Sequence, residues 1–361
     1  MQLTRASALD NVRRPIPAQV VEQTCMARKG LPMADPDLFR CNPRDDGAHP
    51  DPSPGFFEWW YIDGLLDDLS SFSTSWHVDG PDAEGQIRFH FYDTEGKEWH
   101  ASATFPPSQT SASTATCDVS MGSNRLRGEF PRWEMHFRDG GFGYDLIFRN
   151  LTQGVRMPPD GSGGSWAEEP RRYMGWVIAQ PRAEITGELI VEGKRISVHG
   201  IGYHDHNWGA GGQSQSGMNN LGSLWGHWYW GRLHLPNHTL VYSVGTGAPS
   251  LGGNPARLFV ALKGEKLLTF STRIDYEARD MMTDDLTGCE YPQELALKLQ
   301  HRKILGDISL KLRRVLQRSQ FETRGHAYLS FLADCHANLE FDGEKVDVTF
   351  PAIHEHMRPE R

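Results

Sequence analysis

A short segment near the middle of the chain brings together a phenol, a carboxyl group and two imidazoles. Residues 202–209 read GYHDHNWG and directly follow the alternating stretch Ile196–Ile201. If the extended backbone continues, successive side chains point to opposite faces of the strand. Tyr203, Asp205 and Asn207 then share one face. His204, His206 and Trp208 share the other, so the two faces offer different chemistries.

The first of these faces suits acid–base chemistry. Tyr203 and Asp205 place a phenol and a carboxyl group two residues apart. The carboxyl group can act as a proton donor if an apolar wall raises its pKa. The alternative is a polar corner, in which Asp205 and Asn207 only form hydrogen bonds with backbone groups. Both interpretations remain open from these residues alone.

The second face carries an H-x-H pair. His204 and His206 have the spacing at which a strand offers two imidazoles to Zn, Fe or Ni. A third ligand such as His227 or His234 would have to come from elsewhere, and no glutamate follows at a fixed offset. Histidines in aromatic-rich barrels are more often structural hydrogen-bonding groups. We therefore expect no bound metal.

Tryptophan is the unusual feature of the composition, with 11 residues among 361. In the stretch Gly226–Leu235, Trp228 and Trp230 fall on one face of an alternating pattern, while His227 and Tyr229 fall on the other. Two indoles on one face either line an apolar ligand pocket or fill a core. With Trp59 and Trp76, they are our candidates for the wall beside Asp205.

The elements that position these groups are predicted to be strands. Gln86–Tyr92 alternates apolar and polar residues. Ala183–Val198 predicts a hairpin that turns at Glu192-Gly193-Lys194, and Leu295–Leu312 predicts a second hairpin across Gly306-Asp307. Helical periodicity of ten residues or more is scarce. We therefore expect an all-β fold.

The length of the chain indicates more than one domain, because single hydrophobic cores stop growing at about 250 to 300 residues. A glycine-rich break at Gly209–Ser223 lies near the centre of the 361 residues. Two β-barrels or sandwiches packed together would remove the exposed strand edges. We expect an extended arm over residues 1–49, an N-terminal β-domain over 50–207 and a C-terminal β-domain over 208–361.

The charge of the chain limits the kinds of partner to expect, and its cysteine content indicates the cellular compartment. The chain has 37 Lys and Arg against 46 Asp and Glu, a net charge of −9, which argues against nucleic acid as a partner. It has neither a run of 18 apolar residues for a membrane span nor an apolar stretch near its start for secretion. Five scattered cysteines indicate a reducing, cytoplasmic setting. Oligomeric state is not indicated.

Three motifs occur in a recognisable order: EWWY at 58–61, GxGYHDHNWG at 200–209 and WYWG at 228–231. In this order and spacing they resemble the carotenoid 1,2-hydratase (hydroxyneurosporene synthase) superfamily. That superfamily includes kievitone-hydratase-like proteins and lipocalin-like Diels–Alderases and hetero-Diels–Alderases. The resemblance implies two lipocalin-like β-barrel domains packed together, with a ligand pocket between or inside them and no bound cofactor. In the hydratases the Tyr and Asp that match Tyr203 and Asp205 are regarded as essential.

The residues and the resemblance together define a candidate site for a hydrophobic small molecule. The candidate catalytic residues are Tyr203, His204, Asp205 and His206. The candidate substrate-binding residues are Glu58, Trp59, Trp76, His77, Trp176, Asn207, His227, Trp228 and Trp230.

Three activities fit this candidate site. We favour cofactor-independent cyclisation of an unsaturated polyketide or terpenoid intermediate, of the Diels–Alderase or hetero-Diels–Alderase type, by preorganisation and hydrogen-bond activation. The alternatives are hydration of an alkene with Asp205 as the acid, and carriage of a lipophilic ligand without catalysis.

Overall fold

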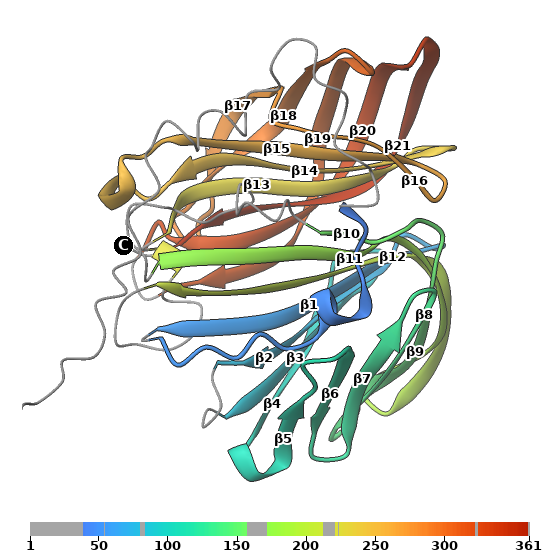
Figure 1. Ribbon diagram of the computed structural model, residues 1–361, viewed down its shortest axis with the longest axis vertical. Helices are drawn as coiled ribbons and strands as arrows, with labels where there is room; N and C mark the ends of the chain where they lie inside the picture. Colours follow the sequence, from blue (N-terminus) through green and yellow to red (C-terminus); the bar gives the residue numbers. More distant parts are fainter. Residues whose placement is uncertain are drawn as a thin grey trace, which may run out of the picture. The chain divides into compact units, whose positions relative to one another are not determined.

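The computed structural model describes residues 39–53, 55–79, 84–156, 172–211, 221–222, 224–321 and 324–359. These residues form almost nothing but strands, arranged in two antiparallel sheets, A and B (Figure 1). The predicted all-β fold is confirmed. In this part of the chain, no helix is both long enough and apolar enough to cross a membrane.

Sheet A comes from the first half of the chain, and its strands follow the order β4-β3-β2-β1-β12-β11-β9-β8-β7-β6-β5, with β10 beside β11. The 3-10 turns η2 (Pro43–Asp46) and η3 (Pro107–Gln109) precede β1 and β5. The sheet curls until β4 packs near β8 and β9. Its strands are β1 (Phe56–Leu66), β2 (Ser71–Val78), β3 (Gly85–Tyr92), β4 (Glu98–Phe105), β5 (Thr110–Ala112), β6 (Cys117–Met121), β7 (Asn124–Glu129), β8 (Arg132–Asp139), β9 (Phe142–Asn150), β10 (Val155–Arg156), β11 (Arg172–Val191) and β12 (Lys194–Gly211).

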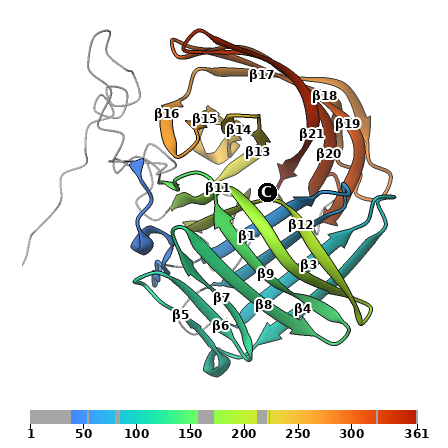
Figure 2. The same cartoon turned by 90° about the vertical axis from the view of Figure 1, so that its right-hand side faces the viewer.

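Sheet B comes from the second half, and its strands follow the order β16-β15-β14-β13-β21-β20-β19-β18-β17. This sheet also curls, which brings β14 and β15 against β17, and Figure 2 shows each sheet curving around its own interior. The turn η5 (Pro249–Leu251) follows β14. Its strands are β13 (Trp225–His234), β14 (His238–Gly247), β15 (Pro255–Lys263), β16 (Lys266–Ser271), β17 (Ile274–Thr283), β18 (Glu290–His301), β19 (Ile304–Gln320), β20 (Ala327–Phe341) and β21 (Glu344–Arg358).

Alternation along the strands gives each sheet its own core. In β1, Trp60 and Ile62 point into the interior of sheet A. Their neighbours Trp59 and Tyr61 point outward, into clusters that residues of both sheets build. Because the outward faces of the two sheets meet in these clusters, the predicted architecture of two packed lipocalin-like β-barrels is confirmed.

The first predicted hairpin is confirmed, and the turn of the second is corrected. Val191 pairs with Lys194, and the intervening Glu192 and Gly193 have φ values of 51° and 77°, as a two-residue hairpin turn requires. The second hairpin turns at residues 302–303, because His301 pairs with Ile304. Gly306 lies inside β19 instead. A Cβ atom there would lie 2.1 Å from the Asn338 carbonyl oxygen, which explains why glycine occurs within the strand.

The predicted domain boundaries stay predictions. Sheet A ends with β12 at Gly211, and sheet B begins with β13 at Trp225. Of the predicted arm, residues 1–38 lie outside the described residues, and residues 39–49 contain η2 with the buried Asp46. Most of the predicted glycine-rich break, residues 212–220 and 223, also lies outside the described residues.

Candidate active site

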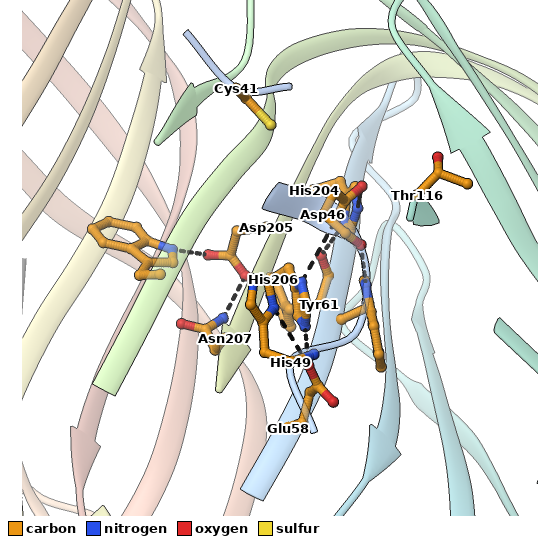
Figure 3. A network of polar contacts seen from close by, with 12 residues as sticks. Cys41, Asp46, His49, Glu58, Tyr61, Thr116, His204, Asp205, His206 and Asn207 are labelled. Carbon is orange, nitrogen blue, oxygen red and sulfur yellow. Dashed lines mark hydrogen bonds and ion pairs between the residues drawn. The ribbon is translucent and has the colours of Figure 1, made fainter. Parts of the chain in front are cut away.

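Strand β12 separates two sets of side chains as the alternation predicted (Figure 3). Tyr203 packs against Trp230 of sheet B, with ring centroids 4.8 Å apart, and Asp205 and Asn207 lie on the same face. His204 and His206 point the other way, into the interior of sheet A, where both are fully buried.

Asp205 is held by three hydrogen-bond donors. Trp176 Nε1 and the Tyr203 hydroxyl donate to its Oδ2 atom, each at 2.8 Å, and Asn207 Nδ2 donates to Oδ1 at 2.8 Å. Burial raises the pKa of Asp205 to about 6, and the three donors oppose this rise because they stabilise the carboxylate. Near pH 7, Asp205 is therefore predominantly an anion that accepts hydrogen bonds.

A cavity of about 180 Å³ lies between the outward faces of the two sheets, and Asp205 is one of its lining residues. An apolar cavity of about 150 Å³ is enough to bind benzene, so this one has room for a ring. Five indoles line it, those of Trp59, Trp176, Trp225, Trp228 and Trp230.

Polar side chains from both sheets complete the lining of the cavity. Sheet A contributes Ser75 and His77, and sheet B contributes Ser243, Gln317 and Glu355, among others. Burial lowers the pKa of His77 to about 3, so its imidazole is neutral and forms a hydrogen bond with the Ser75 hydroxyl at 2.9 Å. The wall is thus largely apolar in surface, with polar groups from both sheets that could orient a ligand.

The structure brings together most of the predicted site, although the roles of these residues stay predictions. Tyr203 lies behind Asp205 as its hydrogen-bond donor. The predicted residues that line the cavity are Trp59, His77, Trp176, Asp205, Asn207, Trp228 and Trp230.

Glu58, His204 and His206 are placed away from the cavity, in a polar network inside sheet A. His206 Nε2 lies 3.0 Å from Glu58 Oε1, and His204 Nε2 lies 3.1 Å from Oδ2 of Asp46. The ring of His206 also stacks on Trp60, with centroids 4.2 Å apart. These contacts fit a role in organising the interior of the barrel.

Trp76 and His227 are also placed away from the cavity. Trp76 points into the interior of sheet A, where its Nε1 donates to the Tyr144 hydroxyl at 3.0 Å. His227 packs beside Tyr229 in sheet B, 3.1 Å from the Tyr276 hydroxyl. Strand alternation accounts for both placements, because the adjacent residues of the same strands, His77 and Trp228, take the positions that face the cavity.

The H-x-H pair has more possible third ligands than the sequence suggested. Each histidine belongs to a group of three residues whose ligand atoms lie within 4.8 Å of one another. These groups are Asp46, Cys117 and His204, and His49, Glu58 and His206. Neither contains His227 or His234, which were the candidates by sequence. One nitrogen of each imidazole already forms a hydrogen bond, His206 Nε2 with Glu58 and His204 Nε2 with Asp46. The absence of a metal stays a prediction.

Sequence reasoning missed Glu355 on β21. Glu355 is a half-buried residue that lines the cavity, and its carboxyl group accepts a hydrogen bond from Trp228 Nε1 at 2.9 Å. Burial raises its pKa to about 7. A signal was present, because Glu355 stands between His354 and His356 as Asp205 stands between His204 and His206.

A buried ion pair between the sheets was missed as well. Asp63 of β1 and Arg232 of β13 are both nearly fully buried and form a salt bridge. Burial raises the pKa of Asp63 to about 6, against the opposing effect of Arg232. The two residues are 169 positions apart, and nothing in the local sequence predicts that they pair.

Comparisons with known proteins agree with this fold. No protein-family model matches the chain. The quinolone epoxide rearrangement protein penF of Penicillium thymicola is 23% identical over 230 residues, which cover 55% of this chain and only 58% of that protein. The match therefore spans less than two thirds of the relative.

Two solved structures have a similar fold over most of their length. CghA in complex with Sch210972 has a TM-score of 0.65 at 13% identity, covering 90% of this chain and 97% of CghA. Kievitone hydratase from Nectria haematococca has a TM-score of 0.57 at 14% identity, covering 88% and 93%. The predicted resemblance to kievitone-hydratase-like proteins is thereby confirmed at the level of the fold.

Proposed function

We propose that the protein is an enzyme of natural-product biosynthesis that cyclises or otherwise isomerises a hydrophobic, unsaturated small molecule without a cofactor. The reaction takes place in the cavity between the two sheets. One observation carries the proposal: a buried carboxylate, Asp205, faces a largely apolar cavity that five tryptophans line. The epoxide rearrangement named for penF, a reaction of the same broad type, supports it.

The indole wall supplies shape and electrostatic stabilisation. Trp228 and Trp230 from sheet B and Trp59 and Trp176 from sheet A present their rings to the cavity. Such a wall holds a flexible unsaturated chain in one reactive conformation and excludes water. Where positive charge develops on the substrate, each ring face stabilises it by about 0.5 to 2 kcal/mol.

Asp205 supplies a fixed negative charge in the cavity. Because Trp176, Tyr203 and Asn207 all donate to it, the carboxylate keeps one orientation throughout the reaction. A preorganised charge of this kind needs no reorganisation when the substrate becomes polarised. In this role Asp205 stabilises a developing cation or accepts a proton from it.

Hydration of an alkene is the second candidate, and the fold shared with kievitone hydratase favours it. That reaction requires an acid strong enough to protonate the alkene. Asp205, the acid that the sequence suggested for hydration, is predominantly ionised near pH 7 and therefore rarely holds a proton to donate. We therefore rank isomerisation above hydration.

Product mass in isotopically labelled water tests the proposal. Purified protein is incubated in H₂¹⁸O with a quinolone epoxide and, separately, with a linear polyene that carries an activated alkene. We expect a new product with the mass of its substrate and no ¹⁸O. A product heavier by one labelled water indicates a hydratase, and recovery of every compound unchanged contradicts the proposal.

Two variants test whether conversion of the substrate depends on the cavity. Asp205→Asn removes the buried charge, and Asp347→Asn removes an exposed carboxylate that lies 2.9 Å from His336 Nε2. We expect Asp347→Asn to retain the parental rate. Equal rates for both variants would place the chemistry elsewhere.

A further inference from the structure

The two halves of the molecule carry the same arrangement of aromatic and acidic residues. In each half the first strand pairs with the last, β1 with β12 in sheet A and β13 with β21 in sheet B. The first strands carry WWY at 59–61 and WYW at 228–230. The last strands carry HDH at 204–206 and HEH at 354–356. The similarity thus lies in the pairing of the strands as well as in their sequences.

The registers of the two strand pairs match. Tyr61 pairs with Asp205 in sheet A, and Trp230 pairs with Glu355 in sheet B. One position along, the histidine stacks on the middle aromatic residue of the facing strand in both halves. The ring centroids are 4.2 Å apart for His206 on Trp60 and 4.5 Å apart for His356 on Tyr229. Asp205 and Glu355 therefore occupy equivalent positions.

Both acids face one cavity, but their surroundings differ. Asp205 is 5% exposed and accepts three hydrogen bonds, whereas Glu355 is more open to the cavity and accepts from Trp228 at 2.9 Å and from the Tyr328 hydroxyl. The negative charges of Asp205 and Asp63 both oppose ionisation of Glu355. A pair of carboxyl groups whose environments differ in this way suits one to be the acid and the other the base.

A chain of hydroxyl groups extends from Glu355 to the ion pair between the sheets. The Tyr328 hydroxyl donates to Glu355 and lies next to the Tyr61 hydroxyl. Tyr61 in turn donates to Oδ2 of Asp63 at 2.9 Å. The charge of Glu355 also acts on Tyr242 of β14, which burial keeps neutral by raising its pKa.

We propose that Glu355 is a second catalytic residue, the proton donor of the cavity, and that Asp205 is its anionic counterpart. The inference rests on the proposed function. Glu355 transfers its proton to an oxygen of the substrate, such as that of an epoxide, as the C–O bond breaks and its electron pair moves to oxygen. Asp205 stabilises the resulting cation and accepts the proton that leaves carbon. Solvent then returns one proton to Glu355 and removes one from Asp205, so the product is an isomer of the substrate.

The test combines turnover with a spectroscopic readout that needs no substrate. Conversion of a quinolone epoxide is measured against pH for the parent, Glu355→Gln, Glu355→Asp and Glu95→Gln, a control at an exposed turn. Infrared difference spectra record the carboxylic C=O band of each variant over the same pH range. We expect a band that titrates near neutral pH in the parent, that titrates at a lower pH in Asp205→Asn because one opposing negative charge is gone, and that is absent from Glu355→Gln.

The expected kinetic result is a loss of about 100-fold or more in kcat for Glu355→Gln, with KM little changed. Glu355→Asp should recover part of the rate, and Glu95→Gln all of it. If the parent converts the probe and a folded Glu355→Gln matches its rate and pH profile, the inference fails while the proposed function stands. If the parent converts neither probe compound, the proposed function fails, and the catalytic role of Glu355 fails with it.

Discussion

The hydrogen-bond donors around the two carboxyl groups of the cavity differ, and they contribute to the difference between the two acids. Trp176 is one of three donors to Asp205, whereas Trp228 is one of two donors to Glu355. A donor to a carboxylate stabilises its ionised form and so lowers its pKa. Trp176 and Trp228 therefore have two functions. Both residues line the cavity, and their N–H groups lower the pKa of its carboxyl groups.

Trp228→Phe separates these two functions. The variant keeps an aromatic ring in the wall but removes the N–H group that Glu355 accepts at 2.9 Å. We expect the pKa of Glu355 to rise further above its ordinary value, so that its infrared band titrates at a higher pH than in the parent. Trp225→Phe is the matched control, since Trp225 lines the same cavity and donates to Met174 Sδ. An unchanged titration in Trp228→Phe would show that this hydrogen bond does not act on Glu355.

Strands decide which neighbouring side chains reach the cavity, and this much was predictable from sequence. Alternation placed Asp205 and Trp228 correctly, and it also explains why Glu58 and Trp76 turn away. Including Glu58 with Trp59 in one site was inconsistent with alternation, because adjacent residues of a strand point to opposite faces. Glu355 was missed because its place depends on the pairing of β13 with β21, although the repeated H-acid-H pattern was visible in the sequence.

At the scale of the strands, the salt bridge between Asp63 of β1 and Arg232 of β13 leads to a prediction about stability. Arg232→Met leaves the Asp63 carboxyl group buried without its partner, and we expect it to lower the free energy of unfolding by about 3 to 5 kcal/mol. Arg257→Met, which breaks the exposed pair with Asp275, should cost at most about 1 kcal/mol. Denaturant unfolding curves measure both. Similar losses in the two variants would contradict the structural role of the buried pair.

Across the whole molecule, two similar sheets place several carboxyl groups where ionisation is disfavoured. Burial raises the pKa of Asp63 and Asp205 to about 6 and that of Glu355 to about 7. Each group binds its proton more tightly in the folded state than in the unfolded state. Between the unfolded and folded pKa values the folded protein therefore holds more protons, and its stability falls as pH rises through this window. No local sequence pattern predicts this property, because it arises from packing the two sheets together.

Glu355→Gln should remove the part of this pH-dependent stability that comes from Glu355. Relative to the parent, we expect its free energy of unfolding to increase by about 2 to 3 kcal/mol between pH 4.5 and pH 8. The variant becomes more stable than the parent at alkaline pH, because only there does the parent have to bury an ionised Glu355 carboxylate. Unfolding curves at several pH values provide the measurement, with Glu95→Gln as the control. A difference from the parent that does not vary with pH would mean that Glu355 titrates normally.

The central claim is that the substrate reacts in the cavity between the two sheets, and filling that cavity tests it most directly. Ser243 lines the cavity from β14, whereas Ser111 is exposed on the edge strand β5. The measurement is the rate at which the parent, Ser243→Phe and Ser111→Phe convert a compound that the parent isomerises. We predict that Ser243→Phe loses about 100-fold in rate because the substrate no longer fits its reactive position, while Ser111→Phe matches the parent. A folded Ser243→Phe variant with the parental rate would contradict the assignment of the cavity as the active site.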